Sequence, residues 1–278
     1  MANTTPPDTD KEMELVTSAD GTEIAVERTG SGSPLVLIHG SGVSDHRRWE
    51  IAEVRPALAE HMTVYALDRR GRGESGDAET YSLEREVQDA VAVVNSISEP
   101  ATLLGHSFGA NIALEASLLL DSLKGLILYE PGIPVGDHEM SDPEVISRMN
   151  GLLSEGKNEE GLTVFLREIG GLSPEEIDVF RSDPSWDDRV TGAHTLPREE
   201  QACREHELRP DRLTTMQTPT LLLSGSESPQ KYKDATKVIN DALPNSRIVT
   251  FDGEKHVAMN NEPEQFVEEV LSFVNQRN

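Results

Sequence analysis

Five short and almost wholly apolar segments restrict the fold of this chain more than any other feature of its sequence. They are rich in leucine, isoleucine and valine and show little alternation of apolar and polar residues: 35–38, 63–67, 101–104, 126–129 and 220–223. Strands of this kind are buried on both faces, as in a parallel sheet between layers of helices. Helical segments such as 82–94 lie between them, with Ser82 as the expected N-cap. The alternation predicts an α/β fold with a mostly parallel, twisted sheet and helices on both faces.

The remaining segments divide the chain into three parts. Residues 13–28 predict an antiparallel hairpin, and residues 1–12, which hold two prolines, predict a flexible tail. After residue 133 amphipathic helices replace the strands, and we expect helices at 144–153, 162–169, 174–180 and 198–207. The predicted parts are a tail (1–12), an α/β core (13–133 and 211–278) and a helical cap (134–210). Because the cap precedes the strand near 219–224, we expect it over the sheet edge where open α/β sheets bind ligands.

The composition excludes several classes of protein. The apolar runs are far shorter than the roughly 18 residues that a membrane span needs, so no transmembrane segment is expected. The N-terminus has no secretory signal pattern, which predicts a cytoplasmic protein. A single cysteine, Cys203, can form no internal disulfide and cannot alone supply a structural zinc site. With 50 acidic and 25 basic residues the net charge is −25, which disfavours nucleic acid and anionic membranes as partners.

The charge pattern also predicts adaptation to high salt. The acidic residues are spread along the chain, and the basic residues comprise 7 lysines and 18 arginines. A dense carboxylate surface repels itself at low ionic strength and is stabilised when salt screens the repulsion. We therefore expect a halophilic protein, with an ordinary acidic enzyme as the alternative.

A G-x-S-x-G pentapeptide carries the clearest chemical signal. Gly105-His106-Ser107-Phe108-Gly109 follows the strand predicted at 101–104 and precedes a helical pattern. A strand that turns directly into a helix forces the serine into strained backbone geometry, and the glycines avoid clashes at this close turn. The turn exposes the hydroxyl of Ser107, and the amides at the start of the helix favour an oxyanion beside it.

At this point the chain resembles the α/β-hydrolase family, in its cap-bearing serine esterase branch. The resemblance extends from Met13 to about Val274 and includes the sequence Leu37-Ile38-His39-Gly40-Ser41-Gly42 and the turn from Asp68 to Ser75. It implies an oxyanion hole formed by the backbone N–H groups of Ser41 and Phe108. It also implies that His256, which follows the final apolar strand, is the general base for Ser107.

The other histidines have simpler interpretations. His39 and His106 belong to loop motifs, where packed and hydrogen-bonded side chains are expected. Five more are expected to face solvent: His46, His61, His138, His194 and His206. Three aspartates around Trp186 lack a histidine at ligand spacing and are interpreted as solvated surface: Asp183, Asp187 and Asp188. No metal or organic cofactor is expected.

In this family a carboxylate orients the histidine and completes a catalytic triad with the serine. The position of this acid departs from the family pattern in the present chain. Most members carry an aspartate three residues beyond Gly225, but Ser228 occupies that position and cannot stabilise an imidazolium as a carboxylate can. Two replacements remain: Glu130, at the end of the strand before the cap, and Glu227. Some branches, including certain haloalkane dehalogenases, carry the acid at the earlier position. We favour Glu130, with Glu227 as the alternative.

These features predict a serine hydrolase that cleaves a small carboxylic ester through an acyl-enzyme. Ser107 replaces the aspartate nucleophile of dehalogenases and epoxide hydrolases, so their alkyl-ester chemistry is not expected. Cap residues near Phe165 and Trp186 are candidate substrate contacts. Four alternatives use the same serine, namely carbon–carbon bond hydrolase, lactonase, thioesterase and cofactor-free perhydrolase chemistry, and a fifth is a non-catalytic small-molecule binding protein.

Overall fold

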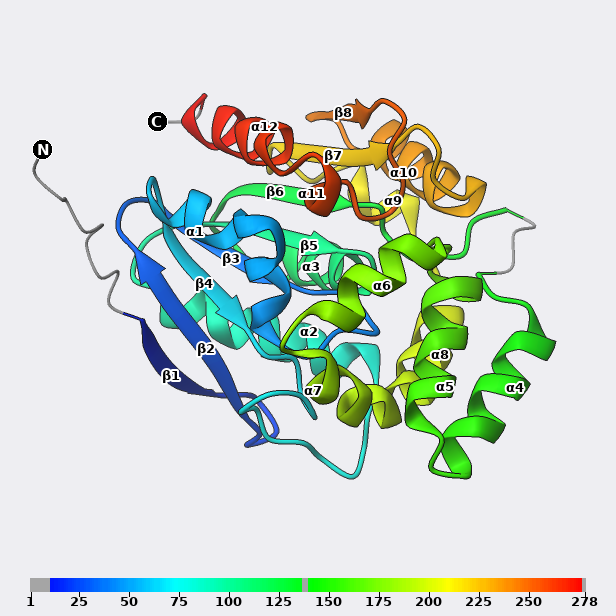
Figure 1. Ribbon diagram of the computed structural model, residues 1–278. Helices are drawn as coiled ribbons and strands as arrows, with labels where there is room; N and C mark the ends of the chain where they lie inside the picture. Colours follow the sequence, from blue (N-terminus) through cyan, green and yellow to red (C-terminus); the bar gives the residue numbers. More distant parts are fainter. Residues whose placement is uncertain (1–10, 137–139, 277–278) are drawn as a thin grey trace, which may run out of the picture.

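The computed structural model describes residues 11–136 and 140–276. Within these residues the strands form one eight-stranded sheet in the order β1-β2-β4-β3-β5-β6-β7-β8 (Figure 1). The strands are β1 (Glu12–Thr17), β2 (Glu23–Gly30), β3 (Pro34–Ile38), β4 (Thr63–Leu67), β5 (Ala101–His106), β6 (Leu123–Tyr129), β7 (Thr220–Gly225) and β8 (Ser246–Phe251). β2 pairs antiparallel with β1 and β4, and all other neighbours are parallel. The predicted fold class is therefore confirmed, as is the N-terminal hairpin.

Helices cover both faces of the sheet, which explains why its strands are apolar throughout. Leu35 and Leu37 of β3 belong to one apolar cluster, whereas Val36 and Ile38 belong to the other, and all four side chains are fully buried. The first cluster includes side chains of α1 (Val54–Ala59), α11 (Ala258–Asn261) and α12 (Pro263–Asn275). The second includes side chains of α2 (Leu83–Ser96), α3 (Phe108–Ser117), α9 (Pro210–Leu213) and α10 (Gln230–Ala242).

The segment between β6 and β7 consists of helices in its described part, and these lie together on one side of the sheet (Figure 1). They are α4 (Pro143–Ser154), α5 (Asn158–Val164), the π-helical turn η2 (Phe165–Ile169), α6 (Pro174–Ser182), α7 (Trp186–Thr191), the 3-10 turn η3 (Gly192–Thr195) and α8 (Leu196–Glu205). We call this segment, from α4 to α8, the cap. The helices agree with the sequence prediction except that α7 was not predicted and the helix expected at 162–169 is divided into α5 and η2.

Two boundary predictions need correction. The hairpin begins at Glu12, inside the stretch assigned to the tail, while residues 1–10 lie outside the described residues. Ser82 precedes α2 with extended backbone, but its side chain makes no capping hydrogen bond. No helix in the described part of the chain is both long enough and apolar enough to cross a membrane.

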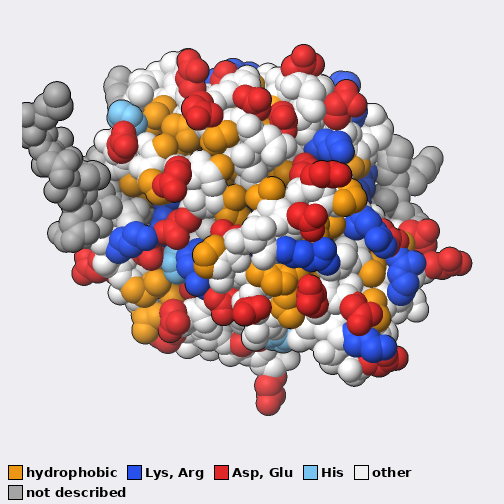
Figure 2. Space-filling view, in the orientation of Figure 1, with side chains coloured by type: hydrophobic (Ala, Val, Ile, Leu, Met, Phe, Trp, Pro, Cys, Tyr) orange, Lys and Arg blue, Asp and Glu red, His pale blue; other side chains and the backbone are white. Residues whose placement is uncertain are grey.

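Acidic side chains are scattered over the visible face of the molecule, with basic side chains among them (Figure 2). This dispersed pattern agrees with the even spread of acidic residues along the sequence. The halophilic interpretation that rests on it stays a prediction.

Candidate active site

Ser107 lies at a tight turn between β5 and α3. Its backbone adopts φ 56° and ψ −122°, a conformation that costs free energy for a residue with a side chain. The flanking glycines permit the turn, because a Cβ atom at Gly105 would lie 2.2 Å from the carbonyl oxygen of Gly109. A Cβ atom at Gly109 would lie 2.3 Å from the carbonyl oxygen of Ile38. The spacing of the pentapeptide is thus a steric requirement of this strand-to-helix junction.

The loop after β3, residues 39–43, packs directly against Ser107, and we call it the oxyanion loop. A Cβ atom at Gly40 would come within 3.0 Å of the Cβ atom of Ser107. Ser41 lines the same cavity as Ser107. Phe108 is the first residue of α3, where backbone N–H groups have no acceptor within the helix. The two N–H groups expected to stabilise an oxyanion therefore come from segments on either side of the serine.

Three arginines hold the carbonyl groups of the oxyanion loop and so fix the orientation of its peptide units. Nη1 of Arg69 donates to the carbonyl oxygen of Gly40 at 3.1 Å, and Nη1 of Arg189 donates to that of Gly42 at 2.9 Å. Nη1 of Arg72 donates to the carbonyl oxygen of Val43. Arg189 belongs to α7, so the cap takes part in positioning this loop.

Buried carboxylates neutralise two of these arginines. Arg69 donates to both oxygens of Glu86, from Nε at 3.0 Å and from Nη2 at 2.5 Å. Arg72 donates from Nη2 to Glu199 of α8 at 2.9 Å. Burial alone would raise the pKa of Glu199, but the charges of Arg69 and Arg72 hold it well below its ordinary value. We call these four residues the loop-support network.

His256 lies in the loop between β8 and α11, and hydrogen bonds from the sheet hold this loop. His106 Nε2 lies 2.8 Å from the carbonyl oxygen of His256. The hydroxyl of Tyr129 donates to the carbonyl oxygen of Lys255 at 2.6 Å and accepts from the amide of Ala258 at 2.8 Å. The backbone on both sides of His256 is therefore fixed by side chains at the ends of β5 and β6.

Glu130 follows β6, is fully buried and contacts the imidazole of His256. Its Oε2 lies 2.6 Å from Nδ1 of His256. Its Oε1 accepts from the hydroxyl of Ser224 at 3.0 Å and from the amide of Gly225 at 2.7 Å. The backbone φ of Glu130 is 45°, a strained value for a residue other than glycine. The carboxylate is thus oriented by the end of β7, and it leaves Nε2 of His256 as the nitrogen that can serve a serine.

The two candidate acids, Glu130 and Glu227, have different surroundings in the structure. Glu227 is exposed, and only its amide is used, in a hydrogen bond to the carbonyl oxygen of Glu254. Ser228, at the position where the family pattern has an aspartate, is buried and its hydroxyl has no hydrogen-bond partner.

Ser107 and His256 line one cavity beneath the cap, with a volume of about 40 Å³. Phe165 lines it too, whereas Trp186, the other candidate contact, does not line it and packs against the first apolar cluster. Hydrogen bonds between a nucleophilic serine and its histidine often tighten only when substrate binds, so the cavity that Ser107 and His256 share is the observation that brings them together. Binding sites for small molecules commonly measure about 300–1,000 Å³, so substrate entry requires movement of the cap or of lining side chains.

Three side chains of this cavity were missed by the sequence analysis. Tyr232 of α10 stacks on His256, with ring centroids 4.1 Å apart and ring planes 13° apart, and its hydroxyl donates to the carbonyl oxygen of Ile169 in η2. Arg48, from the 3-10 segment η1 (His46–Glu53), and Arg189 also line the cavity. Nothing in their sequence surroundings marks these positions, because only the tertiary fold brings them to Ser107.

The burial of the remaining histidines agrees only in part with the sequence prediction. His39 and His106 are buried as expected, and His61 and His194 are exposed as expected. The prediction that His46 and His206 face solvent was wrong: both are buried against carboxylates, Glu27 and Asp68 for His46 and Glu115 for His206. His138 lies outside the described residues.

One cluster has the composition of a metal site. Ligand atoms of Asp45, His46 and Asp68 lie within 4.8 Å of one another. They are already paired, because Asp45 binds Arg47 and Asp68 accepts from the imidazole and amide of His46. Of the aspartates near Trp186, Asp187 and Asp188 are exposed as predicted, whereas Asp183 is half-buried.

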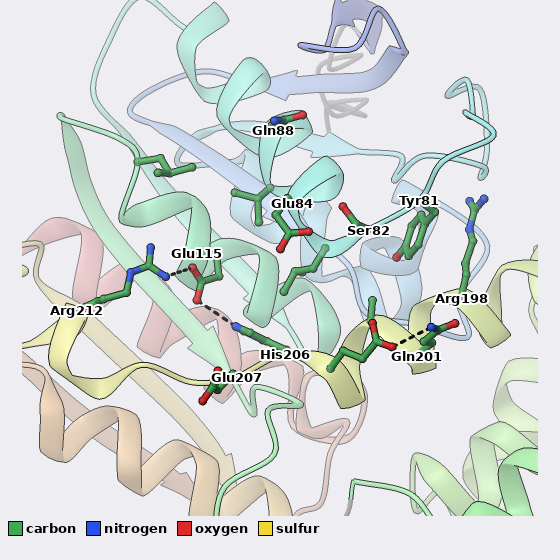
Figure 3. Close-up of a pocket in the computed structure, with 15 residues that line it drawn as sticks. Tyr81, Ser82, Glu84, Gln88, Glu115, Arg198, Gln201, His206, Glu207 and Arg212 are labelled. Carbon is green, nitrogen blue, oxygen red and sulfur yellow. Dashed lines mark hydrogen bonds and ion pairs between the residues drawn. The ribbon is translucent and has the colours of Figure 1, made fainter.

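A second and wider groove lies elsewhere, between α2, α3, α8 and α9 (Figure 3). Its volume is about 610 Å³, and Glu115 crosses it to bind both His206 and Arg212. Ser107 does not line this groove. The candidate catalytic residues Ser107 and His256 therefore lie in the small cavity under the cap.

The comparisons with known proteins agree with this fold. A profile described as "Alpha/beta hydrolase family" matches residues 35–269, and the chain belongs to this family of enzymes. An alpha/beta hydrolase from Sphaerobacter thermophilus is 32% identical in sequence, with a TM-score of 0.80 over 94% of this chain and 99% of that one.

Two curated relatives cover nearly the whole chain. A pimeloyl-[acyl-carrier protein] methyl ester esterase of Aeromonas hydrophila is 28% identical over 90% of this chain and 99% of its own length. A 2-hydroxy-6-oxo-6-(2'-aminophenyl)hexa-2,4-dienoic acid hydrolase of Metapseudomonas resinovorans is 22% identical over 95% of this chain and 92% of its own length. These two relatives thus include an esterase and a dienoic acid hydrolase.

Proposed function

We propose that this protein is a serine hydrolase that cleaves small carboxylic esters through an acyl-enzyme intermediate. The observation that supports this most strongly is the buried pair of Glu130 and His256, with Oε2 and Nδ1 2.6 Å apart, in the cavity that Ser107 lines. A neutral serine is a weak nucleophile, and an oriented imidazole is what activates it. The strained turn at Ser107 and the glycine-rich loop beside it are the other parts that ester cleavage requires.

In the first half of the proposed reaction, Oγ of Ser107 attacks the ester carbonyl carbon while Nε2 of His256 takes the hydroxyl proton. The carbonyl oxygen becomes an oxyanion that accepts hydrogen bonds from the amides of Ser41 and Phe108. Each such donor stabilises the transition state by about 3–4 kcal/mol. The imidazolium then gives its proton to the leaving alkoxide, the carbon–oxygen bond breaks, and Ser107 is left acylated.

In the second half, water replaces the alcohol. Nε2 of His256 takes a proton from water, whose oxygen attacks the acyl carbon, and the imidazolium returns that proton to Oγ of Ser107 as the acid leaves. Glu130 stays ionised throughout and stabilises the imidazolium through Nδ1.

Covalent labelling tests this proposal directly. A fluorophosphonate should label the wild-type protein at Ser107, and a short-chain p-nitrophenyl ester should be hydrolysed in high salt. Ser107→Ala and His256→Ala should each lower kcat by roughly 10⁶-fold. A protein that resists the label and loses nothing on Ser107→Ala would instead be a non-catalytic small-molecule binding protein.

A second candidate is carbon–carbon bond hydrolysis, because one relative is named for hydrolysing a dienoic acid. Lactonase and perhydrolase reactions also use such a serine. Product analysis separates them: an ester gives an acid and an alcohol, a lactone gives one hydroxy acid, and carbon–carbon cleavage gives an acid and a new C–H bond.

We also propose that the protein works in the cytoplasm of a salt-adapted cell. The acidic excess of 25 charges and the preference for arginine over lysine support this proposal.

A further inference from the structure

The arginines that line the cavity differ from the other buried arginines. Six arginine side chains in the described residues are buried: Arg48, Arg55, Arg69, Arg70, Arg72 and Arg189. Four form ion pairs, as in the contacts Arg55–Glu27 at 2.6 Å, Arg69–Glu86 at 2.5 Å, Arg70–Asp89 at 2.7 Å and Arg72–Glu199 at 2.9 Å. Arg48 and Arg189 form no ion pair with any described residue, although acidic residues outnumber basic ones two to one.

Each of these two arginines uses one nitrogen and leaves others without a partner. Nη1 of Arg48 donates to Oδ1 of Asn260 at 2.9 Å, and Nη1 of Arg189 donates to the carbonyl oxygen of Gly42 at 2.9 Å. Nη2 of Arg48 and both Nε and Nη2 of Arg189 are buried without an acceptor. Buried donors of this kind are rare, because leaving one unpaired costs about 1–3 kcal/mol, and more for a charged group.

The free edge of Arg189 has the geometry that binds a carboxylate. Nε and Nη2 form one side of the guanidinium fork, and two other arginines of this chain show what that side binds. Arg69 uses these two nitrogens to hold both oxygens of Glu86, and Arg70 uses them to hold both oxygens of Asp89. The same edge of Arg189 therefore offers a two-point site for a planar anion.

Both guanidinium groups lie beside the reacting serine. They line the cavity of Ser107, and their central carbons lie 5.8 Å (Arg48) and 4.5 Å (Arg189) from the ring centroid of Phe180. Arg189 holds Gly42, two residues beyond the glycine that packs against Ser107. Because Ser107, Arg48 and Arg189 all line this one cavity, a single small substrate bound there can contact both the serine and the fork.

The charges around the pair make an anion favourable there. Burial lowers the pKa of Arg48 to about 10, and burial together with the charge of Arg48 lowers the pKa of Arg189 to about 9. The carboxylates that act on Arg189 are Asp183 and Asp45, and neither forms an ion pair with it. Two cations that stay protonated at neutral pH and lack a counterion favour binding of an anion between them.

We propose that Arg189, through Nε and Nη2, and Arg48, through Nη2, bind the ionised carboxylate of the substrate. The substrate class is then a half-ester of a dicarboxylic acid, whose ester carbonyl lies at Ser107 and whose free carboxylate lies between the two arginines. This inference rests on the proposed serine hydrolase function and names its substrate class.

The test compares two esters of one shape, monoethyl glutarate and ethyl glutaramate, in which a neutral amide replaces the carboxylate. The wild-type kcat/KM should be at least about tenfold higher for the acid, because hydrogen bonds between charged groups are the stronger ones. Arg189→Gln should bring the ratio close to one, Arg48→Gln should lower it partly, and Arg189→Lys should restore part of it. Arg181→Gln, at an exposed arginine of the cap that does not line the cavity, should leave the ratio unchanged.

Arg189 also supports the oxyanion loop, and loss of that support should lower kcat/KM for both esters alike. The ratio of the two kcat/KM values therefore reports only the recognition of the substrate carboxylate. A wild-type ratio near one, with both esters cleaved, would overturn the inference and leave the serine hydrolase standing. An Arg189→Gln ratio equal to that of wild type would also overturn it.

A binding measurement separates this inference from failure of the proposed function. Glutarate should raise the melting temperature of Ser107→Ala, which cannot turn over, and should have no such effect on the double variant Ser107→Ala, Arg189→Gln. This result would support the carboxylate site even if no ester were hydrolysed. Stabilisation by inorganic phosphate in place of glutarate would contradict the carboxylate assignment.

Discussion

The buried arginines of the loop-support network, here called the paired side, differ from the two arginines that line the cavity of Ser107, here called the cavity side. On one side Arg69 and Arg72 are neutralised by Glu86 and Glu199, which belong to α2 and to α8 of the cap. On the cavity side Arg48 and Arg189 are equally buried but have no carboxylate. A paired buried charge supports structure, whereas an unpaired one is unfavourable until a ligand completes it. The paired arginines therefore support the fold, and the unpaired ones are those proposed to bind the substrate.

The largest stability effect is expected on the paired side. Glu199→Gln leaves Arg72 without a carboxylate, so the free energy of unfolding should fall by about 3–4 kcal/mol. Urea denaturation followed by circular dichroism measures this change. The matched control is Glu200→Gln: burial raises the pKa of Glu200, and the group lies 2.5 Å from the hydroxyl of Ser141 and forms no ion pair with an arginine. Equal losses in the two variants would contradict the role of the network.

His46 and its two carboxylate partners, which lie near the oxyanion loop, should make the free energy of unfolding depend on pH. Burial alone would lower the pKa of His46, but hydrogen bonds to Asp68 and Glu27 raise it to about 9. The folded state therefore binds a proton that the unfolded state releases near pH 6.5, so this stabilisation is complete below about pH 6.5 and is lost as pH rises through about 9. The loss should be roughly 2 kcal/mol between pH 6 and 9.5.

Urea denaturation of the wild-type protein across this pH range, beside His46→Asn, measures the effect. The variant should lack most of the decline. A wild-type protein whose stability does not change between these pH values would contradict the assignment of a protonated His46.

Salt should affect the contribution of the exposed charges to stability more than that of the buried ion pairs. Raising KCl into the molar range should raise the melting temperature by roughly 2–4 °C or more, because salt screens the repulsion among exposed carboxylates. The difference between wild type and Glu199→Gln should stay nearly constant, because buried pairs are screened much less. A melting temperature that does not change with KCl concentration would refute the halophilic proposal.

The smallest stability effect is expected on the cavity side. Arg48→Met removes a fully buried cation that has no counterion, so the free energy of unfolding should stay within about 1 kcal/mol of wild type or rise. Arg69→Met, which leaves Glu86 and Glu199 buried with one fewer cation, should lose about 3 kcal/mol or more. If urea denaturation shows the two variants to be equally unstable, the contrast between the two sides is wrong.

Much of the fold could be predicted because its causes are local. The apolar strands lack alternation since both faces of the sheet are covered, and the glycines around Ser107 are required by close backbone contacts within the turn. Ser228 at the usual position left Glu130 and Glu227 as candidates, and Glu130 was favoured by the resemblance to family branches that carry the acid at the end of the earlier strand. In the structure it is the carboxylate that contacts His256.

The rest depends on contacts between distant segments. Arg189 adjoins two exposed aspartates on α7, so its sequence surroundings are those of a surface residue, yet its side chain is fully buried. His46 and His206 were expected in solvent because their carboxylate partners are 19 or more residues away in the chain. The hydrophobic periodicity of the sequence does not predict these contacts between distant side chains, because they form only when the sheet and the cap assemble.

Replacing Glu130 is the most direct test of the proposed catalytic triad. Glu130→Gln preserves the shape of the side chain but removes the charge facing Nδ1 of His256, so kcat for a p-nitrophenyl ester should fall by roughly 10⁴-fold. Glu227→Gln, at an exposed position, should retain wild-type activity. Full activity in Glu130→Gln together with a large loss in Glu227→Gln would contradict the assignment and move the acid to the position after β7.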